Sequence, residues 1–293
     1  MTLSRNLSTL GQAVTTAGNL PTANLTGTIA SAQLSGSYTG ITGVGTLAAG
    51  SIPSSLITGL PDFSTANVQT FDSTGTWTKP ANASMARIQL WGGGGGAASS
   101  NVSGGGGGGG GAYLELTVPI SYLAATVTTT VGGAGAGGSA GNVSGGTGGT
   151  SQITLSTAFQ NRTTFQAPGG NGGTNRSGIN YEAGGYGGGF GFSALQYGGY
   201  GGYQTNCYPC GFPAGDGIWG GGGGAFRGQT AGNSSYGGGG GSAYGSAPGS
   251  SYFGGNGGTN NSAGVAPGGG GGGGNTYTAG GAGAAGRIVI TSW

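Results

Sequence analysis

The amino-acid sequence predicts a mostly β protein in which polyglycine II-type helices extend from a small β scaffold, with little α-helix. Three observations support this fold class. Glycine accounts for 81 of the 293 residues. Most of these glycines follow residue 91, and strand-like segments at 86–91 and 286–293 bracket them. Many stand in uninterrupted runs, namely Gly92–Gly96, Gly104–Gly111, Gly220–Gly224, Gly237–Gly241 and Gly268–Gly274.

Runs of glycine are ordered only when their main chain is densely hydrogen-bonded, because glycine loses more conformational freedom on folding than any other residue. A flexible linker is the alternative interpretation. The apolar segments 112–120 and 194–197 and an aromatic content of 9% favour order. A left-handed threefold helix rises about 3.1 Å per residue, so the run Gly104–Gly111 would span roughly 25 Å. Such helices, packed side by side, can satisfy one another's N–H and C=O groups.

The first 17 residues have a different character from the glycine-rich part. Their aliphatic side chains recur at alternating spacings of four and three, which is heptad spacing, although it lasts for only about two heptads. We interpret residues 1–17 as an N-terminal anchor segment. The anchor positions are Leu3, Leu7, Leu10 and Val14.

Residues 18–61 contain a repeat. The segments 18–27, 27–36 and 50–59 share the pattern G-x-[LI]-[AP]-[ST]-[AS]-x-[LI]-[ST]-G. One copy cannot bury its own two aliphatic side chains, and repeats of this kind need stacked neighbours or several chains. We therefore expect residues 18–61 to form a shaft within an intertwined oligomer. A Ser/Thr/Gly linker with scattered aliphatic residues is the alternative.

Residues 62–91 read as a junction that ends in the first strand, and residues 92–293 as a glycine-rich distal domain. In the segment 86–91 the alternation places Ile88 and Leu90 on one face. The same alternation marks further strands at 113–118, 127–131 and 152–155, and it points Ile288 and Ile290 of the last strand inward. Across neighbouring strands, Glu115 is expected to pair with Arg87 or Arg287.

The composition excludes several functional classes. The chain has no histidine, 4% charged residues and a net charge of +2. We therefore expect no Ser-His or Cys-His nucleophile, no metal site, no cofactor and no nucleic-acid partner. No apolar stretch reaches the length of a membrane span, so membrane insertion is not expected. Glu182 with Asp216 could serve as a glycosidase pair, but solvated carboxylates explain them more simply.

Cys207 and Cys210 are the only cysteines. Two thiols without another cysteine or a histidine cannot complete a zinc site. The surrounding sequence does not read as the βαβ setting of a thioredoxin-type site. We expect a disulfide between Cys207 and Cys210 that forms after release from the cell, with two free thiols as the alternative.

The segment 181–226 is the candidate binding region, because it combines aromatic residues with glycine. Tyrosine on a Gly- and Ser-rich backbone is typical of antibody paratopes, where it supplies large, rigid contact area. Alternatively, the rings cover the flanks of the glycine-rich structure. The candidate receptor-binding residues are Tyr181, Tyr186, Phe190, Tyr197, Tyr200, Tyr203, Tyr208, Trp219 and Phe226.

An ordered set of motifs resembles the Gly-rich domain found at the ends of many bacteriophage tail fibres. It comprises TFDSTGTWTKP, ARIQLWGGGGG, GGGGAYLELTVP, TVTTTVGGAGAGG, GGTSQITL and the terminal GAAGRIVITSW. The upstream LPTANLTGTIASAQLSGSYTGITGVGTL is similar to fibre-shaft sequences of the same proteins. The resemblance covers residues 18–293. The Gly-rich adhesins of T-even-type phages, which pack polyglycine helices and bind receptors through distal loops, are a looser analogue.

The resemblance implies an elongated, intertwined homotrimeric fibre of the virion, assembled in the host cytoplasm and released by lysis. Its distal domain would bind a bacterial surface receptor, a glycan or an outer-membrane protein, without enzymatic activity. The anchor residues at the N-terminus would contact other tail or baseplate proteins. The sequence does not match the large anchoring domain of long tail fibres, so attachment to tail, baseplate or head stays open. A head or tail decoration fibre without a specific receptor is the alternative.

Overall fold

The computed structural model describes residues 66–101, 104–175, 184–188, 199, 203–204, 211–226, 228–243, 245–275 and 277–293, with the backbone alone for 203–204 and 211–212. The chain divides into two compact units, Met1–Gly59 and Leu60–Trp293. All described residues belong to the second unit. The expected anchor at 1–17 and shaft at 18–61 lie outside the described residues.

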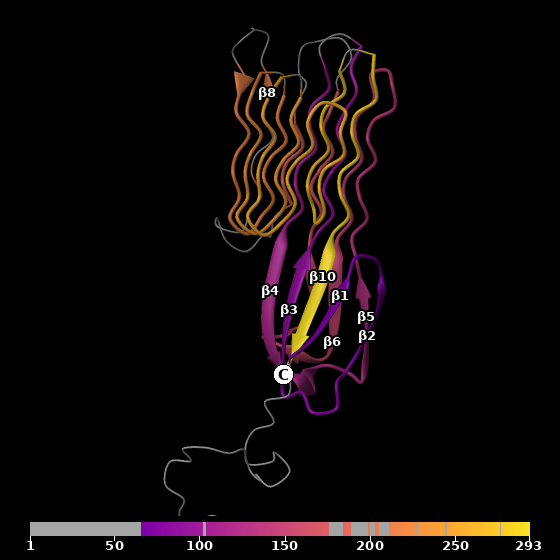
Figure 1. Ribbon diagram of the computed structural model, residues 1–293, viewed down its shortest axis with the longest axis vertical. Coiled ribbons are helices and arrows are strands. Elements are labelled where there is room, and N and C mark those ends of the chain that lie inside the picture. Colours follow the sequence, from indigo (N-terminus) through magenta and orange to yellow (C-terminus); the bar gives the residue numbers. More distant parts are fainter. Residues whose placement is uncertain are drawn as a thin grey trace, which may run out of the picture. The chain divides into compact units, whose positions relative to one another are not determined.

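Two four-stranded antiparallel sheets form the β part of this unit (Figure 1). The first sheet has the order β1-β10-β3-β4, so the last strand of the chain lies between β1 and β3. The second has the order β2-β5-β6-β7. The first sheet consists of β1 (Asn67–Phe71), β10 (Arg287–Ser292), β3 (Met85–Trp91) and β4 (Tyr113–Pro119).

The strands of the second sheet are β2 (Gly75–Thr78), β5 (Thr126–Thr130), β6 (Ser151–Phe159) and β7 (Arg162–Ala167). A short 3-10 helix, η4 (Ile120–Tyr122), follows β4. Two further strands, β8 (Tyr203–Gln204) and β9 (Gly211–Phe212), form a small separate pair. The described residues contain no α-helix. The expected mostly β fold with little α-helix is therefore confirmed for this part of the chain.

The two large sheets pack face to face around one hydrophobic core. Ile88 and Leu90 of β3 and Ile288 and Ile290 of β10 are fully buried there, as the alternation predicts. The second sheet contributes its own inward residues, among them the fully buried Trp77. The segment 62–91, expected to be a junction, thus supplies β1, β2 and β3 to these sheets.

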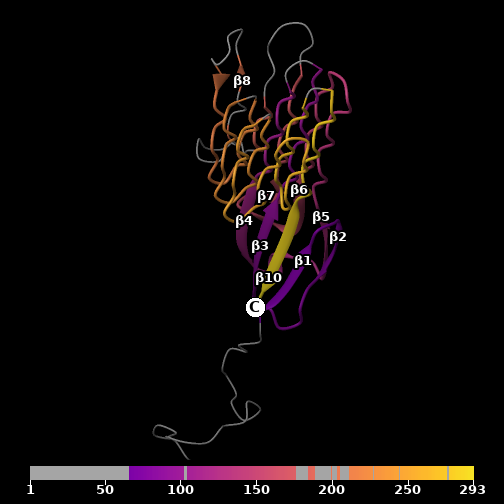
Figure 2. The same ribbon diagram turned by 45° about the horizontal axis from the view of Figure 1, so that its top comes forward.

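The glycine bundle consists of the described segments between β3 and β4, between β5 and β6, and between β7 and β10. Figure 1 shows these segments running side by side beyond the ends of β3, β4 and β10, and the turned view of Figure 2 shows several layers of them. They are connected by main-chain hydrogen bonds although they are not strands.

Hydrogen-bond directions in the bundle repeat every three residues. Successive N–H groups of the segment 92–99 donate to three different neighbouring segments, and the same three directions recur along it. Carbonyl groups of the segment accept bonds from three more neighbours. The three donor directions are set by bonds from Gly92 N to Ala112 O at 2.8 Å, from Gly93 N to Gly149 O at 2.9 Å and from Gly94 N to Ala284 O at 2.8 Å.

The uninterrupted glycine runs occupy the interior of the bundle. Each of the five runs, with its flanking residues, is hydrogen-bonded to six other segments. A side chain has no room there, because a Cβ built on Gly108 would lie 2.0 Å from the carbonyl oxygen of Gly95. On the interior Gly94 it would lie 2.0 Å from the carbonyl oxygen of Gly269. The glycine content therefore follows from the close approach of main chains.

Candidate binding surface

Three turns of the glycine bundle are copies of one another at a step of 17 residues. They lie at 215–220, 232–237 and 249–254, with the sequences GDGIWG, GNSSYG and GSSYFG. Each copy begins and ends with glycine and carries an aromatic residue just before its last glycine. This repeat was not apparent from the glycine runs, because the runs themselves look alike in every copy.

Hydrogen bonds stack the three turns in register. Gly217 bridges Ser234, and Ser234 bridges Ser251, both in parallel orientation. The main-chain N–H of Asn233 donates to Asp216 Oδ1 at 2.6 Å. One copy later, the N–H of Ser250 donates to Asn233 Oδ1 at 2.9 Å. The polar side chain at the second position of one turn thus holds the next turn.

The aromatic rings of these turns form a continuous stack. The ring centroids of Trp219 and Tyr236 lie 4.3 Å apart with the planes 7° from parallel. Those of Tyr236 and Phe253 lie 4.9 Å apart at 12°. We call Trp219, Tyr236 and Phe253 the aromatic ladder. Tyr113 of β4 stacks against Tyr236 at 5.3 Å and continues the ladder inward.

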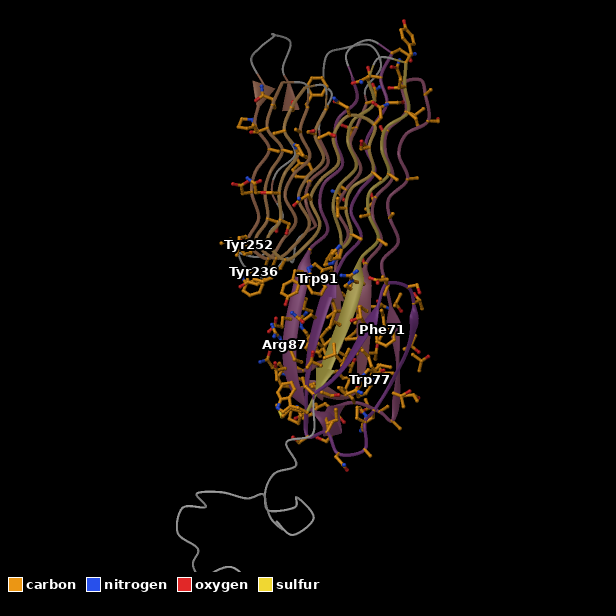
Figure 3. The ribbon with its side chains drawn as sticks, viewed as in Figure 1. Phe71, Trp77, Arg87, Trp91, Tyr236 and Tyr252 are labelled. Carbon is orange, nitrogen blue, oxygen red and sulfur yellow. The ribbon has the colours of Figure 1, made fainter. Side chains whose placement is uncertain are left out.

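The rings of the ladder differ in solvent exposure, with Tyr236 half-buried between its two neighbours. Tyr113 is buried, Trp219 is 36% exposed, and Phe253 is 55% exposed. Tyr252 is 89% exposed and packs on Phe253 with a tilt of 57° between the rings. Figure 3 shows Tyr236 and Tyr252 at the end of the bundle nearest the sheets, with Arg87 on the same side of the view. The ladder is therefore an open aromatic surface rather than a closed core.

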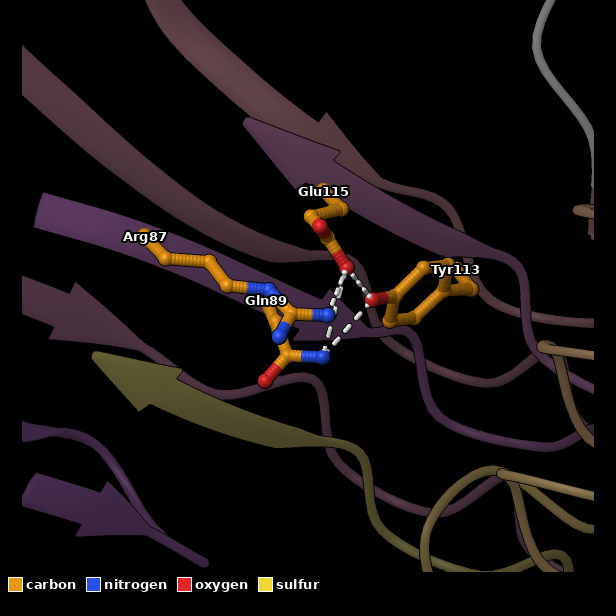
Figure 4. A network of polar contacts seen from close by, with 4 residues as sticks. All are labelled: Arg87, Gln89, Tyr113 and Glu115. Atoms are coloured by element: carbon orange, nitrogen blue, oxygen red, sulfur yellow. Dashed lines mark hydrogen bonds and ion pairs between the residues drawn. The ribbon is translucent and has the colours of Figure 1, made fainter. Parts of the chain in front are cut away.

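A polar network on β3 and β4 adjoins the ladder through Tyr113 (Figure 4). Arg87 Nη2 donates to Glu115 Oε2 at 2.7 Å, which confirms one of the two expected pairings. The Tyr113 hydroxyl donates to the same oxygen. Gln89 Nε2 lies 2.8 Å from the Tyr113 hydroxyl and 3.4 Å from Glu115 Oε2. Arg287, the other expected partner of Glu115, instead pairs with Asp72 at 2.6 Å.

The network shifts the ionisation of its members. Burial raises the pKa of Tyr113, and its hydrogen bond to Glu115 adds to the shift. Partial burial alone would raise the pKa of Glu115, but the hydrogen bonds from Arg87 and Tyr113 outweigh it, and this pKa lies below its usual value. The hydrogen bond to Glu115 raises the pKa of Arg87. At neutral pH the network thus holds one positive and one negative charge and a neutral phenol.

The sequence-predicted binding residues are placed differently from one another. Trp219 belongs to the aromatic ladder, and Tyr186 is exposed elsewhere on the bundle. Phe226 is only 2% exposed and therefore packs inside the bundle instead of facing a partner. For Tyr203 the structure gives the backbone of β8 alone. Tyr181, Phe190, Tyr197, Tyr200, Tyr208 and the pair Cys207 and Cys210 lie outside the described residues.

Sequence reasoning missed Tyr236, Tyr252 and Phe253. These three residues lie beyond the aromatic-rich window that ends at 226, where Tyr236 and the pair Tyr252 and Phe253 are surrounded by glycines and serines. The available signal was the 17-residue spacing that connects Trp219, Tyr236 and Phe253. A search for internal repeats finds it once the glycine runs are left out of the comparison.

The described part of the chain offers little other site chemistry. It holds no cluster of three or more His, Cys, Asp or Glu side chains that could bind a metal ion. It also holds no helix long and apolar enough to cross a membrane. The chemistry that the described surface offers is ring contact and hydrogen bonding.

A β sandwich that carries a hydrogen-bonded glycine bundle defines this chain as a glycine-rich β domain protein. Comparison with known families agrees, because a family model described as a glycine-rich domain matches residues 65–293. The chain belongs to this family of glycine-rich domains. The match includes both the sheets and the bundle, which supports treating them as one unit. No curated protein matches the chain.

Proposed function

We propose that this protein is a non-enzymatic adhesin of a bacteriophage tail fibre, and that its glycine-rich domain binds a receptor on the bacterial surface. The observation that carries the proposal is the exclusion of side chains from the bundle interior. Because the interior glycine runs leave no room for a Cβ, exposed rings such as Trp219, Tyr252 and Phe253 stand in the turns of the bundle. Such a bundle is a rigid support for displayed loops, which is the arrangement that recognition requires.

The finer features of the fibre belong to the same proposal. The threefold recurrence of hydrogen-bond directions supports polyglycine II-type helices, which have three residues per turn. A homotrimer would present three copies of the surface on one fibre, and weak single contacts would then gain from effective concentration. We place the protein in the virion, joined through its N-terminal segment to other tail or baseplate proteins.

The carboxylates of the described residues support binding rather than catalysis. Asp72 pairs with Arg287, and Glu115 pairs with Arg87. Asp216 accepts the main-chain N–H of Asn233 and so holds two turns together. A general acid or base needs a carboxyl group that is available to a substrate. All three of these groups have structural partners instead.

Binding to bacteria tests the proposal directly. Purified, labelled full-length protein is titrated onto intact candidate host cells, and the bound fraction is measured with and without excess unlabelled protein. We expect saturable binding that prevents adsorption of phage carrying the same fibre. Binding to non-host cells is the control. Absence of binding to every strain that the phage infects would overturn the proposal and favour a decoration fibre without a receptor.

A further inference from the structure

We propose that the aromatic ladder, together with Tyr252 and the Arg87–Glu115 network, is a binding site for a neutral polysaccharide of the bacterial surface. The inference rests on the proposed adhesin function and specifies its ligand and its site. The site lies at the end of the bundle nearest the sheets and includes Trp219, one of the residues expected from the sequence. It is built entirely from described residues.

The outer end of the ladder offers an aromatic surface for a sugar ring. Tyr236 stacks on Phe253, yet Phe253 remains 55% exposed and can contact a ligand. The next position at the repeat spacing is Gly270, which adds no ring to the stack. Tyr252 packs against Phe253, with the ring centroids 5.6 Å apart and the planes tilted by 57°. A pyranose ring, whose one face is largely apolar C–H, can take the place of the missing ring.

Polar atoms surround these rings and have no partner within the described part of the protein. They are Trp219 Nε1, the hydroxyl of Tyr236 and the hydroxyl of Tyr252. Rings with an apolar body and a polar tip are suited to ligands that have both an apolar face and hydrated polar groups. The hydroxyl groups of a polysaccharide can accept hydrogen bonds from all three tips and can also donate hydrogen bonds to the two tyrosine hydroxyls.

The adjoining network supplies further hydrogen bonds at the base of the ladder. All its described contacts to Glu115 reach Oε2, which leaves Oε1 as an acceptor. Arg87 uses Nη2 for that contact, while a guanidinium group has five N–H donors in total. Because Tyr113 stacks on the ladder and also belongs to the network, the apolar and polar parts of the site adjoin each other.

The charge of the site favours a neutral ligand. Arg87 and Glu115 carry opposite charges 2.7 Å apart and so add no net charge, and the carboxylate of Asp216 in the first turn would repel a polyanion. The whole chain carries only 4% charged residues and thus provides little long-range field. The ladder extends over three successive turns, which fits several units of a linear polymer better than one isolated sugar.

The test compares two exposed tyrosines of the same protein. Tyr252 is 89% exposed at the ladder, and Tyr277 is 70% exposed outside it. Polysaccharide purified from a host strain that the protein binds is titrated into four full-length proteins. These are the wild type, Tyr252→Ala, the double variant Tyr252→Ala with Phe253→Ala, and Tyr277→Ala. Binding is followed by calorimetry and by Trp fluorescence. Equal thermal unfolding midpoints establish that the variants are folded.

We expect Tyr252→Ala to weaken polysaccharide binding and the double variant to weaken it at least about tenfold, as removal of aromatic anchors does at interfaces. Tyr277→Ala should bind like the wild type. Periodate oxidation of the cells should abolish cell binding, while protease treatment should leave it intact.

Three outcomes would overturn the saccharide site while leaving the adhesin function standing. Cell binding could survive periodate, it could be lost with protease, or it could be equal in the wild type and the double variant. A wild type that binds no host cell at all would instead overturn the adhesin function. Weakening of binding by Tyr277→Ala to the same extent as by Tyr252→Ala would also count against the ladder as the site.

Discussion

The interior of the β sandwich consists of side chains, whereas the interior of the glycine bundle consists of main chain. In the sandwich, Ile88, Leu90 and Trp77 fill the space between two sheets, and backbone hydrogen bonds stay within each sheet. In the bundle, each interior run bonds to six neighbouring segments through its main chain, and the run itself has no side chains. The comparison teaches that one chain can order its interior in two ways, and that the two interiors should respond oppositely to the size of a residue.

The two regions meet at the ends of β3, β4 and β10, where the main chain changes its hydrogen-bonding pattern. Trp91 still pairs with Tyr113 and Arg287 within the sheet, and Gly92 already donates into the bundle. Ser151 joins the two regions there. Its hydroxyl donates to Trp91 O at 2.6 Å and accepts the N–H of Gly132 at 2.9 Å.

The largest effect is expected from adding one methyl group to the bundle interior. In Gly108→Ala, the new Cβ would lie 2.0 Å from Gly95 O, so the main chains must separate and lose hydrogen bonds. We expect a loss of more than about 4 kcal/mol in the free energy of unfolding, or failure to fold. Chemical denaturation of the purified variant measures it.

The matched control is Gly133→Ala in the same bundle. A Cβ at Gly133 meets no atom within 4 Å, so this variant should be neutral or stabilised by about 0.4–1 kcal/mol through the unfolded state. If the two alanine variants unfolded at the same denaturant concentration, the main-chain interior would not be the source of stability.

The sandwich should respond to the opposite change, the removal of volume. Trp77 is fully buried between the sheets. We expect Trp77→Ala to lose about 3–5 kcal/mol through the cavity that it creates. Thermal or chemical unfolding checks the value, with Val68→Ala on the exposed side of β1 as a control that should change stability by less than about 0.5 kcal/mol. A Trp77 variant as stable as this control would contradict the assignment of the core.

The difference between a side-chain interior and a main-chain interior also decides how well the sequence predicts each region. In the sandwich, alternation of apolar and polar residues located the strands and the inward faces, as for Ile288 and Ile290. In the bundle, the runs indicated main-chain packing, but identical glycines carry no information on which run adjoins which. That arrangement depends on the turns, where Asp216 and Asn233 hold successive copies. The ladder was therefore predicted only at Trp219, and its partners Tyr236 and Phe253 were missed.

The junction gives a smaller effect that tests how firmly the two regions are joined. Ser151→Ala leaves Trp91 O and Gly132 N without their shared hydroxyl in a buried place. We expect a loss of about 1–3 kcal/mol, the cost of leaving buried groups unsatisfied. Ser156→Ala, whose hydroxyl bonds to Tyr122 O on the exposed side of β6, should cost about 0.5 kcal/mol or less. Equal losses in both variants would contradict the joining role.

The smallest effect concerns the pH dependence of the polar network. Because the pKa of Glu115 is lower in the folded than in the unfolded protein, its contribution is present above the unfolded value of about 4.5 and is lost as the pH falls through the folded value. Glu115→Gln should remove this part of the acid sensitivity. The pair is partly exposed, so the difference from wild type should stay below about 1 kcal/mol. Denaturation series at pH 7 and pH 3 measure it, and parallel pH curves for both proteins would contradict the linkage.

The all-main-chain interior also affects how stability depends on temperature. Exposure of apolar surface on unfolding raises the heat capacity, whereas exposure of polar surface lowers it. Unfolding of the bundle exposes mostly peptide groups, so its heat-capacity change per residue should be small. Its stability curve should then be flatter than that of the sandwich, with less weakening in the cold. If the protein serves on a virion as we propose, its displayed turns would keep the same support over a wide range of temperatures.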